Sequence, residues 1–274
     1  MSRRRSRKEI AEIGIYDFLG YIGAFNSPFI GGMAGTRRLL SKLDITSESG
    51  VLEVGCASGF TSCMIAEDYD CSLTGIDLSE ILIDKARERA RKRKLSRTRF
   101  EVANALELPY ENDSFDSVFG VAVTALIPDK LRVLQEYMRV TKPGGTIGTL
   151  DLFVKDGASE EVRDKFNGIF MDILGSDNEI MSINEWSALF QQTGFQDIEI
   201  EENYSNVFEM PKNRGNAVGA TLRLVYHMII NGVVRQRVRK LLGMRNTISL
   251  RSEGEYENVG YLIFTAKKPE FAIF

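Results

Sequence analysis

Residues 51–59 read VLEVGCASG, an apolar run of strand length followed by a turn rich in glycine and serine. The segment from Phe60 to Glu67 then has the length and composition of a helix. Further along the chain, the same order of strand, turn and helix recurs up to residue 150. Strands that alternate with helices of this length favour a parallel sheet with helices on both faces. We therefore expect an α/β, doubly wound, Rossmann-like core.

Two later segments extend this core, because residues near 195–201 and 259–267 also have the pattern of strands. The sequence thus predicts a seven-stranded, mostly parallel sheet with helical cap insertions. We expect an N-terminal basic arm with a cap helix at 1–36, an α/β core at 37–152, and the remainder of the sheet at 153–274, with insertions at 153–181 and 203–257. The core strands are expected at 50–55, 72–77, 99–103, 115–123 and 146–150, with a turn at 142–145 before the last of them.

The composition excludes several classes of protein. Apolar residues make up 43% of the 274 and charged residues 27%, which excludes global disorder and a disulfide scaffold. A formal charge of -3 provides no global basic field for nucleic acid or an anionic membrane. Three cysteines without a CxxC motif, and one histidine, predict no metal site and a reducing compartment. No run of about 20 apolar residues could span a bilayer. We expect a cytoplasmic protein whose basic N-terminus is a disordered arm rather than an export signal.

Polar and small residues follow three successive predicted strands. The glycine-rich turn after the first strand would let a ligand reach backbone N–H groups, because glycine has no side chain to block the approach. Asp77 closes the second strand, where a carboxylate can accept hydrogen bonds from both hydroxyls of a ribose. Asn104 and Ala105 follow the third strand and could meet an adenine ring. These three turns predict a site for an adenosine-containing ligand at the carboxyl edge of the sheet.

In the order and spacing of its motifs, the chain resembles the class I S-adenosylmethionine-dependent methyltransferases, within them the small-molecule and quinone-type branch. The resemblance covers roughly residues 37–152. It implies a methyltransferase that moves the methyl group of S-adenosylmethionine to its acceptor by in-line displacement. The matching segments are Glu53-x-Gly55-x-Ala57-x-Gly59, Gly75-Ile76-Asp77-Leu78-Ser79, residues 103–110 (ANALELPY), residues 114–118 (SFDSV) and residues 139–145 (RVTKPGG).

The resemblance also implies a role for each matched residue. Glu53 would orient the amino group of the cofactor, Asp77 would hold its ribose, and Leu78 would lie beside the adenine. Ala57 stands where the family usually has a glycine, and Asn104 where an aspartate is common. The turn residues Gly55, Cys56, Ala57 and Gly59 would line the methionine part, Asn104 and Ala105 would meet the adenine edge, and Val121 would pack near the cofactor.

The acceptor is expected to be enclosed, because both insertions leave the carboxyl edge of the sheet, where ligands of such sheets bind. A small-molecule or lipid- and quinone-like acceptor fits an enclosed site. Two residues are candidates for catalysis. Tyr16 belongs to a Tyr-Asp pair that resembles one preceding the core in quinone-type relatives, and an aromatic core anchor is the alternative. His227 is the only imidazole, and packing on a helix is the alternative to a role as general base.

Several alternatives stay open. The amphipathic pattern from Val218 to Lys240 indicates either a cap helix, which we favour, or peripheral contact with a membrane. The nine basic residues within 85–99 indicate a solvated helix face rather than a nucleic-acid groove. A scaffold or regulatory protein that binds S-adenosylmethionine without turnover, and an RNA methyltransferase, are the competing functions.

Overall fold

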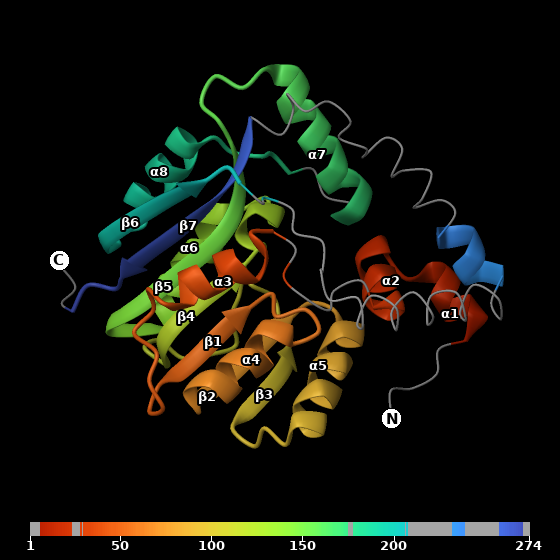
Figure 1. Cartoon of the computed structure of the whole chain (residues 1–274), viewed down its shortest axis with the longest axis horizontal. Helices are drawn as coiled ribbons and strands as arrows, with labels where there is room; N and C mark the ends of the chain where they lie inside the picture. Colours follow the sequence, from red (N-terminus) through yellow and green to blue (C-terminus); the bar gives the residue numbers. More distant parts are fainter. Residues whose placement is uncertain are drawn as a thin grey trace.

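The computed structural model describes residues 6–23, 28, 30–174, 178–205, 207, 232–238 and 258–270. Within these residues the strands form one seven-stranded sheet in the order β3-β2-β1-β4-β5-β7-β6 (Figure 1). Strands β1 to β5 are parallel, and β7 runs antiparallel to both β5 and β6. The predicted α/β doubly wound sheet is confirmed. The strands are β1 Gly50–Val54, β2 Ser72–Asp77, β3 Thr98–Val102, β4 Phe115–Val121, β5 Thr141–Val154, β6 Gln196–Asn203 and β7 Val259–Lys267.

Helices cover both faces of the sheet. They are α1 Arg7–Glu12, α2 Ile15–Ile22, α3 Gly32–Leu40, α4 Phe60–Tyr69, α5 Glu80–Arg93, α6 Lys130–Val140, α7 Glu160–Leu174 and α8 Ile183–Gln192, with a 3-10 turn, η1, at Thr124–Leu126. Alternate residues of β1 point to opposite layers, so that Val51 packs with α3 and α4 while Leu52 packs with α6 and α8. Because both faces of β1 are buried in this way, its sequence is an apolar run without alternating polar residues.

Polar caps define where the helices begin. The Ser79 hydroxyl accepts a hydrogen bond from the backbone N–H of Leu82 at 3.2 Å, which caps the start of α5. Ser182 and Glu185 form a reciprocal capping box at the start of α8. On α8, Trp186 is fully buried and its indole N–H donates to the Leu152 carbonyl at 3.2 Å, which ties the helix to β5.

Several strand boundaries differ from those expected, and β5, which also continues past residue 150 to Val154, differs most. Strand β5 begins at Thr141 and not at Thr146, so the expected turn at 142–145 lies within the strand. The reason is that Thr141 pairs with Phe115 ahead of an irregularity in the ladder, and Gly144, at φ +73°, absorbs the distortion. Strand β4 ends at Val121 and not at residue 123, because Ala122 has a φ of +56° and breaks the extended backbone.

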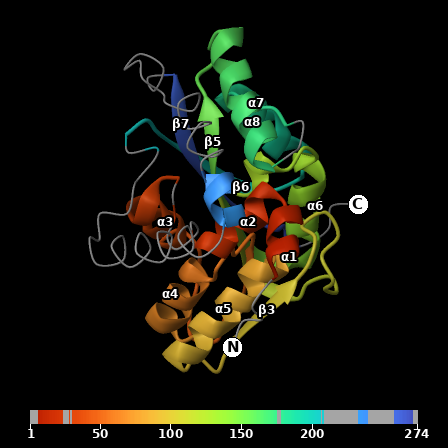
Figure 2. The same ribbon diagram turned by 90° about the vertical axis from the view of Figure 1, so that its right-hand side faces the viewer.

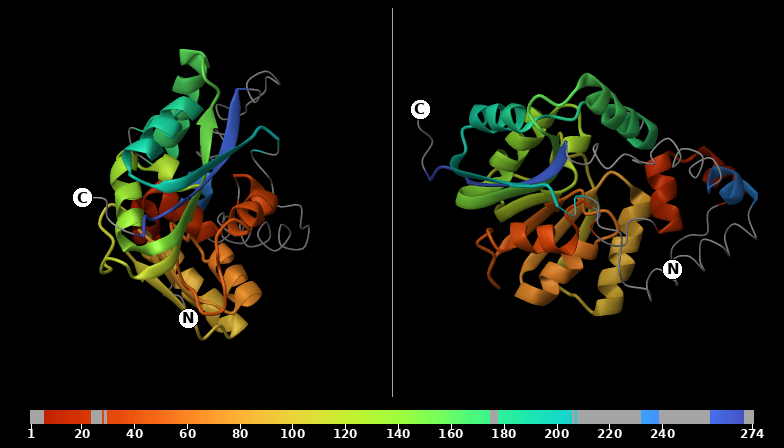
Figure 3. Two further views of the ribbon diagram at one scale, coloured as in Figure 1. Left: turned by 90° about the vertical axis from the view of Figure 1, so that its left-hand side faces the viewer. Right: turned by 45° about the horizontal axis from the view of Figure 1, so that its top comes forward.

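A small second core joins the N-terminal helices to a late part of the chain. We call α1, α2 and the helical segment 232–238 the N-terminal cap. Ile10, Phe18, Val234 and Val238 form its buried cluster, and the guanidinium of Arg237 lies 4.4 Å from the centre of the Phe18 ring. Figure 2 shows these helices grouped together, and Figure 3 shows them at the opposite end of the molecule from β6 and α8. The cap therefore lies beside the β1 to β3 half of the sheet.

Helix α2 attaches this cap to α5. The Lys85 ammonium donates to the Tyr21 carbonyl at 3.0 Å, and Gly20 lies so close to α5 that an added Cβ would be 2.8 Å from a methyl carbon of Leu82. Within the described part of the chain, no helix is both long and apolar enough to cross a membrane. His227 and most of the amphipathic segment from Val218 to Lys240 lie outside the described residues.

Candidate active site

The turn between β1 and α4 is held in a conformation that favours small residues. Gly55, Ala57 and Gly59 have φ values of +71°, +46° and +68°. A Cβ on Gly55 would lie 2.5 Å from a methyl carbon of Val123, and a Cβ on Gly59 would lie 2.7 Å from the Cβ of Ala86. The two glycines thus allow both the turn and the close packing of Val123 and Ala86 on its backbone.

Ala57, which replaces the usual glycine of the motif, adopts the left-handed conformation that a glycine would. A non-glycine residue in this region costs about 1 kcal/mol or more. Its N–H donates to an oxygen of Asp77 at 3.0 Å, so the strained turn is tied to the end of the neighbouring strand. The departure from the motif therefore preserves the backbone geometry of the turn.

Glu53 lies beneath this turn, 3% exposed, and accepts a very short hydrogen bond from the Ser62 hydroxyl on α4. Burial raises the pKa of Glu53 to about 8, although the Ser62 hydrogen bond acts in the opposite direction. A buried carboxyl group that is readily protonated is a suitable partner for a ligand ammonium group, because the arrival of the cation favours the ionised form.

The raised pKa of Glu53 makes the stability of the protein depend on pH. The folded state favours the neutral form of the Glu53 carboxyl, so protonation of Glu53 stabilises the folded state relative to the unfolded chain. This stabilisation is complete below about pH 4.5 and is lost as the pH rises through about 8. We expect the free energy of unfolding to fall across this range, with a contribution from Glu53 of up to about 1.4 kcal/mol per pH unit. Urea unfolding of Glu53→Gln at several pH values should show a clearly flatter dependence. A slope equal to that of the wild type would contradict the assignment, and Glu48→Gln, at an exposed position, is the control.

Asp77 ends β2 and accepts hydrogen bonds on both carboxylate oxygens. One oxygen accepts from the Ser79 N–H at 2.9 Å, and the other from the Ala57 N–H and the Tyr16 hydroxyl, each at 3.0 Å. Burial raises the pKa of Asp77, opposed by the hydrogen bond from Ser79. Tyr16 comes from α2, where the neighbouring Asp17 accepts a very short hydrogen bond from the Ser79 hydroxyl. The Tyr-Asp pair of the N-terminal segment is thus bound directly to the end of β2.

Apolar side chains are exposed beside Asp77. Leu78 is 67% exposed and Val102, which ends β3 opposite Asp77 in the register, is 49% exposed. Large apolar groups at adjacent strand ends form a surface on which a flat ring can lie. The importance of Val102 was not anticipated from the sequence, where it is one more apolar residue of a strand.

The remaining predicted residues take different positions. The side-chain oxygen of Asn104 accepts from the Leu106 N–H at 3.0 Å and stabilises the turn after β3, while Ala105 is buried among residues of the α6 layer. Val121 ends β4 and packs against the α3 and α4 layer. Cys56 is 4% exposed, and burial raises the pKa of its thiol. The structure thus brings Tyr16, Glu53, the turn and Asp77 together, whereas His227 lies outside the described residues.

Most of the basic side chains within 85–99 form hydrogen bonds or ion pairs with other residues of the protein. The Arg87 side chain donates to the Phe100 carbonyl at 2.9 Å, Arg93 pairs with Glu67 at 2.8 Å, and Arg97 donates to the Ser47 carbonyl at 3.0 Å. These contacts support a structural role for the basic run rather than a nucleic-acid groove. No cluster of three or more potential metal ligands occurs among the described residues.

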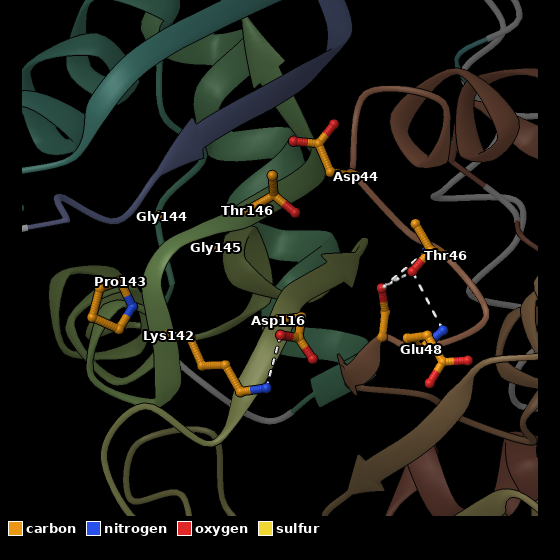
Figure 4. A pocket seen from close by; sticks show the side chains of 10 residues that line it. Asp44, Thr46, Glu48, Asp116, Lys142, Pro143, Gly144, Gly145 and Thr146 are labelled. Atoms are coloured by element: carbon orange, nitrogen blue, oxygen red, sulfur yellow. Dashed lines mark hydrogen bonds and ion pairs between the residues drawn. The ribbon is translucent and has the colours of Figure 1, made fainter.

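Two open pockets lie away from these residues. One, of about 320 Å³, includes Asp116 together with Lys142 and Pro143 from the start of β5, at the amino edge of the sheet (Figure 4). There the Lys142 ammonium contacts the Asp116 carboxylate at 2.7 Å. The other, of about 500 Å³, lies between the start of α6, α7 and α8. None of the residues that resemble cofactor ligands lines either pocket, and Asp77 is instead in contact with Tyr16 of α2.

Comparisons with known proteins show which family the chain is similar to. A family model described as a methyltransferase domain matches residues 45–203. The chain is 25% identical over 242 residues to 27-O-demethylrifamycin SV methyltransferase of Amycolatopsis mediterranei, a match that covers 86% of this chain and 83% of that protein. It is 30% identical over 169 residues to O-methyltransferase rstn1 of Aspergillus nomiae, covering 61% of this chain and 73% of that protein.

Solved structures share the fold at low sequence identity. The [4+2]-cyclase SpnF superimposes with a TM-score of 0.70 at 20% identity, covering 93% of this chain and 94% of the other. Phosphoethanolamine N-methyltransferase 2 of Haemonchus contortus, solved with S-adenosyl-L-methionine, gives a TM-score of 0.64 at 21% identity, covering 97% of this chain and 60% of the other. The overall arrangement of strands and helices is therefore that of known proteins, including a methyltransferase and a cyclase.

Proposed function

Because the chain belongs to the family of S-adenosylmethionine-dependent methyltransferases, we propose that it methylates a small-molecule or lipid- and quinone-like acceptor. The observation that carries this proposal is the convergence of Glu53, the glycine-rich turn and Asp77 at the carboxyl ends of β1 and β2. The N-terminal cap lies beside these residues, which favours a small, enclosed acceptor over a macromolecular one. The relative named for a rifamycin substrate supports a small acceptor as well.

The residues present fit S-adenosylmethionine. We assign the cradle of Gly55, Cys56, Ala57 and Gly59 to the methionine part, with Glu53 beneath it to hold the ammonium group. Asp77 would bind the ribose hydroxyls, and the exposed Leu78 would lie beside the adenine. Asn104, Ala105 and Val121 would complete the walls of the site.

In this assignment the protein acts by binding, orientation and the exclusion of water. S-adenosylmethionine, when bound, supplies an electrophilic methyl group. The chain's residues would fix the cofactor at both ends, so that an acceptor enclosed by the cap reaches the methyl group in line. We take the core as residues 37–152 and the insertions 153–181 and 203–257 as parts of the acceptor side.

We propose that Tyr16 acts as a gate and not as the catalytic base. Its hydroxyl occupies a carboxylate oxygen of Asp77 that a ribose hydroxyl would need. Burial and the neighbouring Asp77 raise the pKa of Tyr16 well above its usual value, which makes it a poor proton acceptor near neutral pH. His227 stays a candidate base on sequence grounds alone.

Tyr16→Phe is expected to bind S-adenosylmethionine roughly threefold to tenfold more tightly, because the competing hydrogen bond to Asp77 is lost. Calorimetric titration measures the dissociation constant directly. Turnover at saturating cofactor should stay within about twofold of the wild type, since no proton passes through the hydroxyl. Weaker binding, or a large loss of turnover, would contradict the role of a gate.

We propose the cytoplasm as the site of action. The contacts of Arg237 count against the alternative of peripheral contact with a membrane surface. The Arg237 side chain donates to the Ile10 carbonyl at 2.7 Å and covers the Phe18 ring, so its charge is used within the protein. A basic residue engaged in this way supports the role of a cap helix for the segment that ends at Lys240.

The proposed activity can be tested with a methyl-labelled cofactor. The purified protein is first titrated with S-adenosylmethionine by calorimetry, and then incubated with phenolic, quinol and lipid hydroxyls and small amines. Labelled product from any of these acceptors supports the proposal. Cofactor binding without product across the panel would favour a scaffold without turnover. Labelled RNA, together with steeply salt-dependent RNA binding, would favour an RNA methyltransferase.

A further inference from the structure

The loop that follows β4, residues 122–127, packs directly on the glycine-rich turn between β1 and α4, which we call the cofactor turn. The side chain of Val123 fills the space beside two glycines, so that a Cβ on either Gly55 or Gly120 would lie 2.5 Å from one of its methyl carbons. Ala122, at φ +56°, turns the chain into this loop and donates its N–H to the Leu150 carbonyl at 2.7 Å. The position of Val123, and with it the shape of the turn, therefore depends on how the loop is held.

Asp151 holds the loop from the side of β5. It is completely buried, one residue past the register position where β4 ends. One carboxylate oxygen accepts from the Ala125 N–H at 3.0 Å, and the other accepts a very short hydrogen bond from the Thr149 hydroxyl. Among the residues that the structure describes, no cation forms an ion pair with Asp151, and a buried carboxylate without such a partner is costly, so its retention in an apolar strand calls for a specific role.

Asn178 holds the same residue, Ala125, through its carbonyl. It is 2% exposed, and its amide group donates a very short hydrogen bond to the Ala125 carbonyl. Its side-chain oxygen accepts from the ammonium of Lys130 at 2.6 Å, and Lys130 also donates to the Ile127 carbonyl at 3.2 Å. Asn178 belongs to the segment before α8, so the Ala125 residue is bound by side chains from two separate parts of the chain.

We propose that Asp151 and Asn178 are positioning residues for methyl transfer, which clamp the backbone of Ala125 and so hold the loop after β4 against the cofactor turn. The proposal rests on the proposed methyl transfer at this site. Its first consequence is that the Ala125 amide is protected from hydrogen exchange, which can be measured without any acceptor. Neither side chain needs to touch the reacting atoms. Both act through the backbone of one residue, whose N–H and carbonyl they bind separately.

Conservative variants separate these contacts from simple burial. Asp151→Asn keeps an oxygen that can accept from the Ala125 N–H, whereas Asp151→Ala leaves this buried donor without its acceptor. Asn178→Asp keeps the oxygen that binds Lys130 but loses the donor to the Ala125 carbonyl. Ser117→Ala is the matched control, because the Ser117 hydroxyl is a buried hydrogen-bonding group on β4, paired with Thr146 at 2.7 Å near the opposite edge of the sheet.

The test combines hydrogen exchange with cofactor binding and turnover. In Asp151→Ala the Ala125 amide is expected to exchange at least about tenfold faster, with S-adenosylmethionine affinity and kcat each reduced about tenfold, and Asp151→Asn should restore most of these losses. Asn178→Asp should lower kcat by a similar factor. The Ser117→Ala control should leave exchange at Ala125 and cofactor affinity unchanged.

Two results would overturn the clamp: unchanged exchange at Ala125 in Asp151→Ala, or equal losses in Ser117→Ala. If no acceptor is methylated by the wild type, the proposed function fails, yet exchange and cofactor affinity still decide whether the clamp exists.

Discussion

Asp77→Ala is expected to weaken S-adenosylmethionine binding by about a hundredfold or more. The variant removes the carboxylate that would accept from the two ribose hydroxyls, and hydrogen bonds to a charged group contribute about 1.5–3 kcal/mol each. Every 1.36 kcal/mol corresponds to a factor of ten in affinity. Calorimetric titration of the purified variant measures the loss.

The variant also deprives Ala57 and Ser79 of the acceptor for their backbone N–H groups, so a control for folding is needed. Asp116→Ala serves this purpose, because Asp116 accepts from the Gly50 N–H at 2.7 Å and binds Lys142 at the opposite edge of the sheet. It should lose stability but keep its affinity for the cofactor. Retention of wild-type affinity by a folded Asp77→Ala protein would refute the position assigned to the ribose.

Gly55→Ala is expected to destabilise the protein by about 2–5 kcal/mol, a large part of the 5–15 kcal/mol that holds a typical domain together. About 1–2 kcal/mol comes from placing an alanine at φ +71°. A further 1–3 kcal/mol comes from overpacking, because the new Cβ would lie 2.5 Å from a methyl carbon of Val123. Urea unfolding measures the change.

A second substitution separates the two causes. Val123→Gly removes every side-chain atom that collides with the new Cβ, including the Cβ of Val123 at 2.8 Å, so Gly55→Ala should cost only about 1–2 kcal/mol in the Val123→Gly background. A cost that is the same in both backgrounds would show that backbone strain alone explains the effect. The result would reveal whether the glycine serves the turn or the packing of the loop on it.

The sequence was sufficient to predict the sheet and the turn, because these depend on local patterns. A buried strand reads as an apolar run, and the glycines at 55 and 59 mark a turn whichever residues pack on it. The predicted start of β5 at residue 146 and the predicted end of β4 at residue 123 were wrong. The pairing of Thr141 with Phe115 and the positive φ of Ala122, which set the true boundaries, depend on neighbouring strands.

Contacts between distant segments could not be read from the sequence. Tyr16 meets Asp77 across 61 residues, and the identity of its partner depends on how α2 packs on α5. The role of Asp151 was missed although its signal is visible, because an acid within the apolar run 147–154 is unusual in a buried strand. Its partner Asn178 lies in a segment with no motif, so only the folded chain brings the two together at Ala125.

On the ribosome, β6 emerges before the strand that it needs. Among the described strands β6 pairs only with β7, which is translated later and inserts between β5 and β6. The contact between α1 and the segment 232–238 forms later still, because Arg237 binds the Ile10 carbonyl across 227 residues, or about 11–45 seconds of synthesis at roughly 5–20 residues per second. During that interval the apolar face around Phe18 and the unpaired edge of β6 are open to other nascent chains, so this protein is expected to depend on chaperones while it is being made.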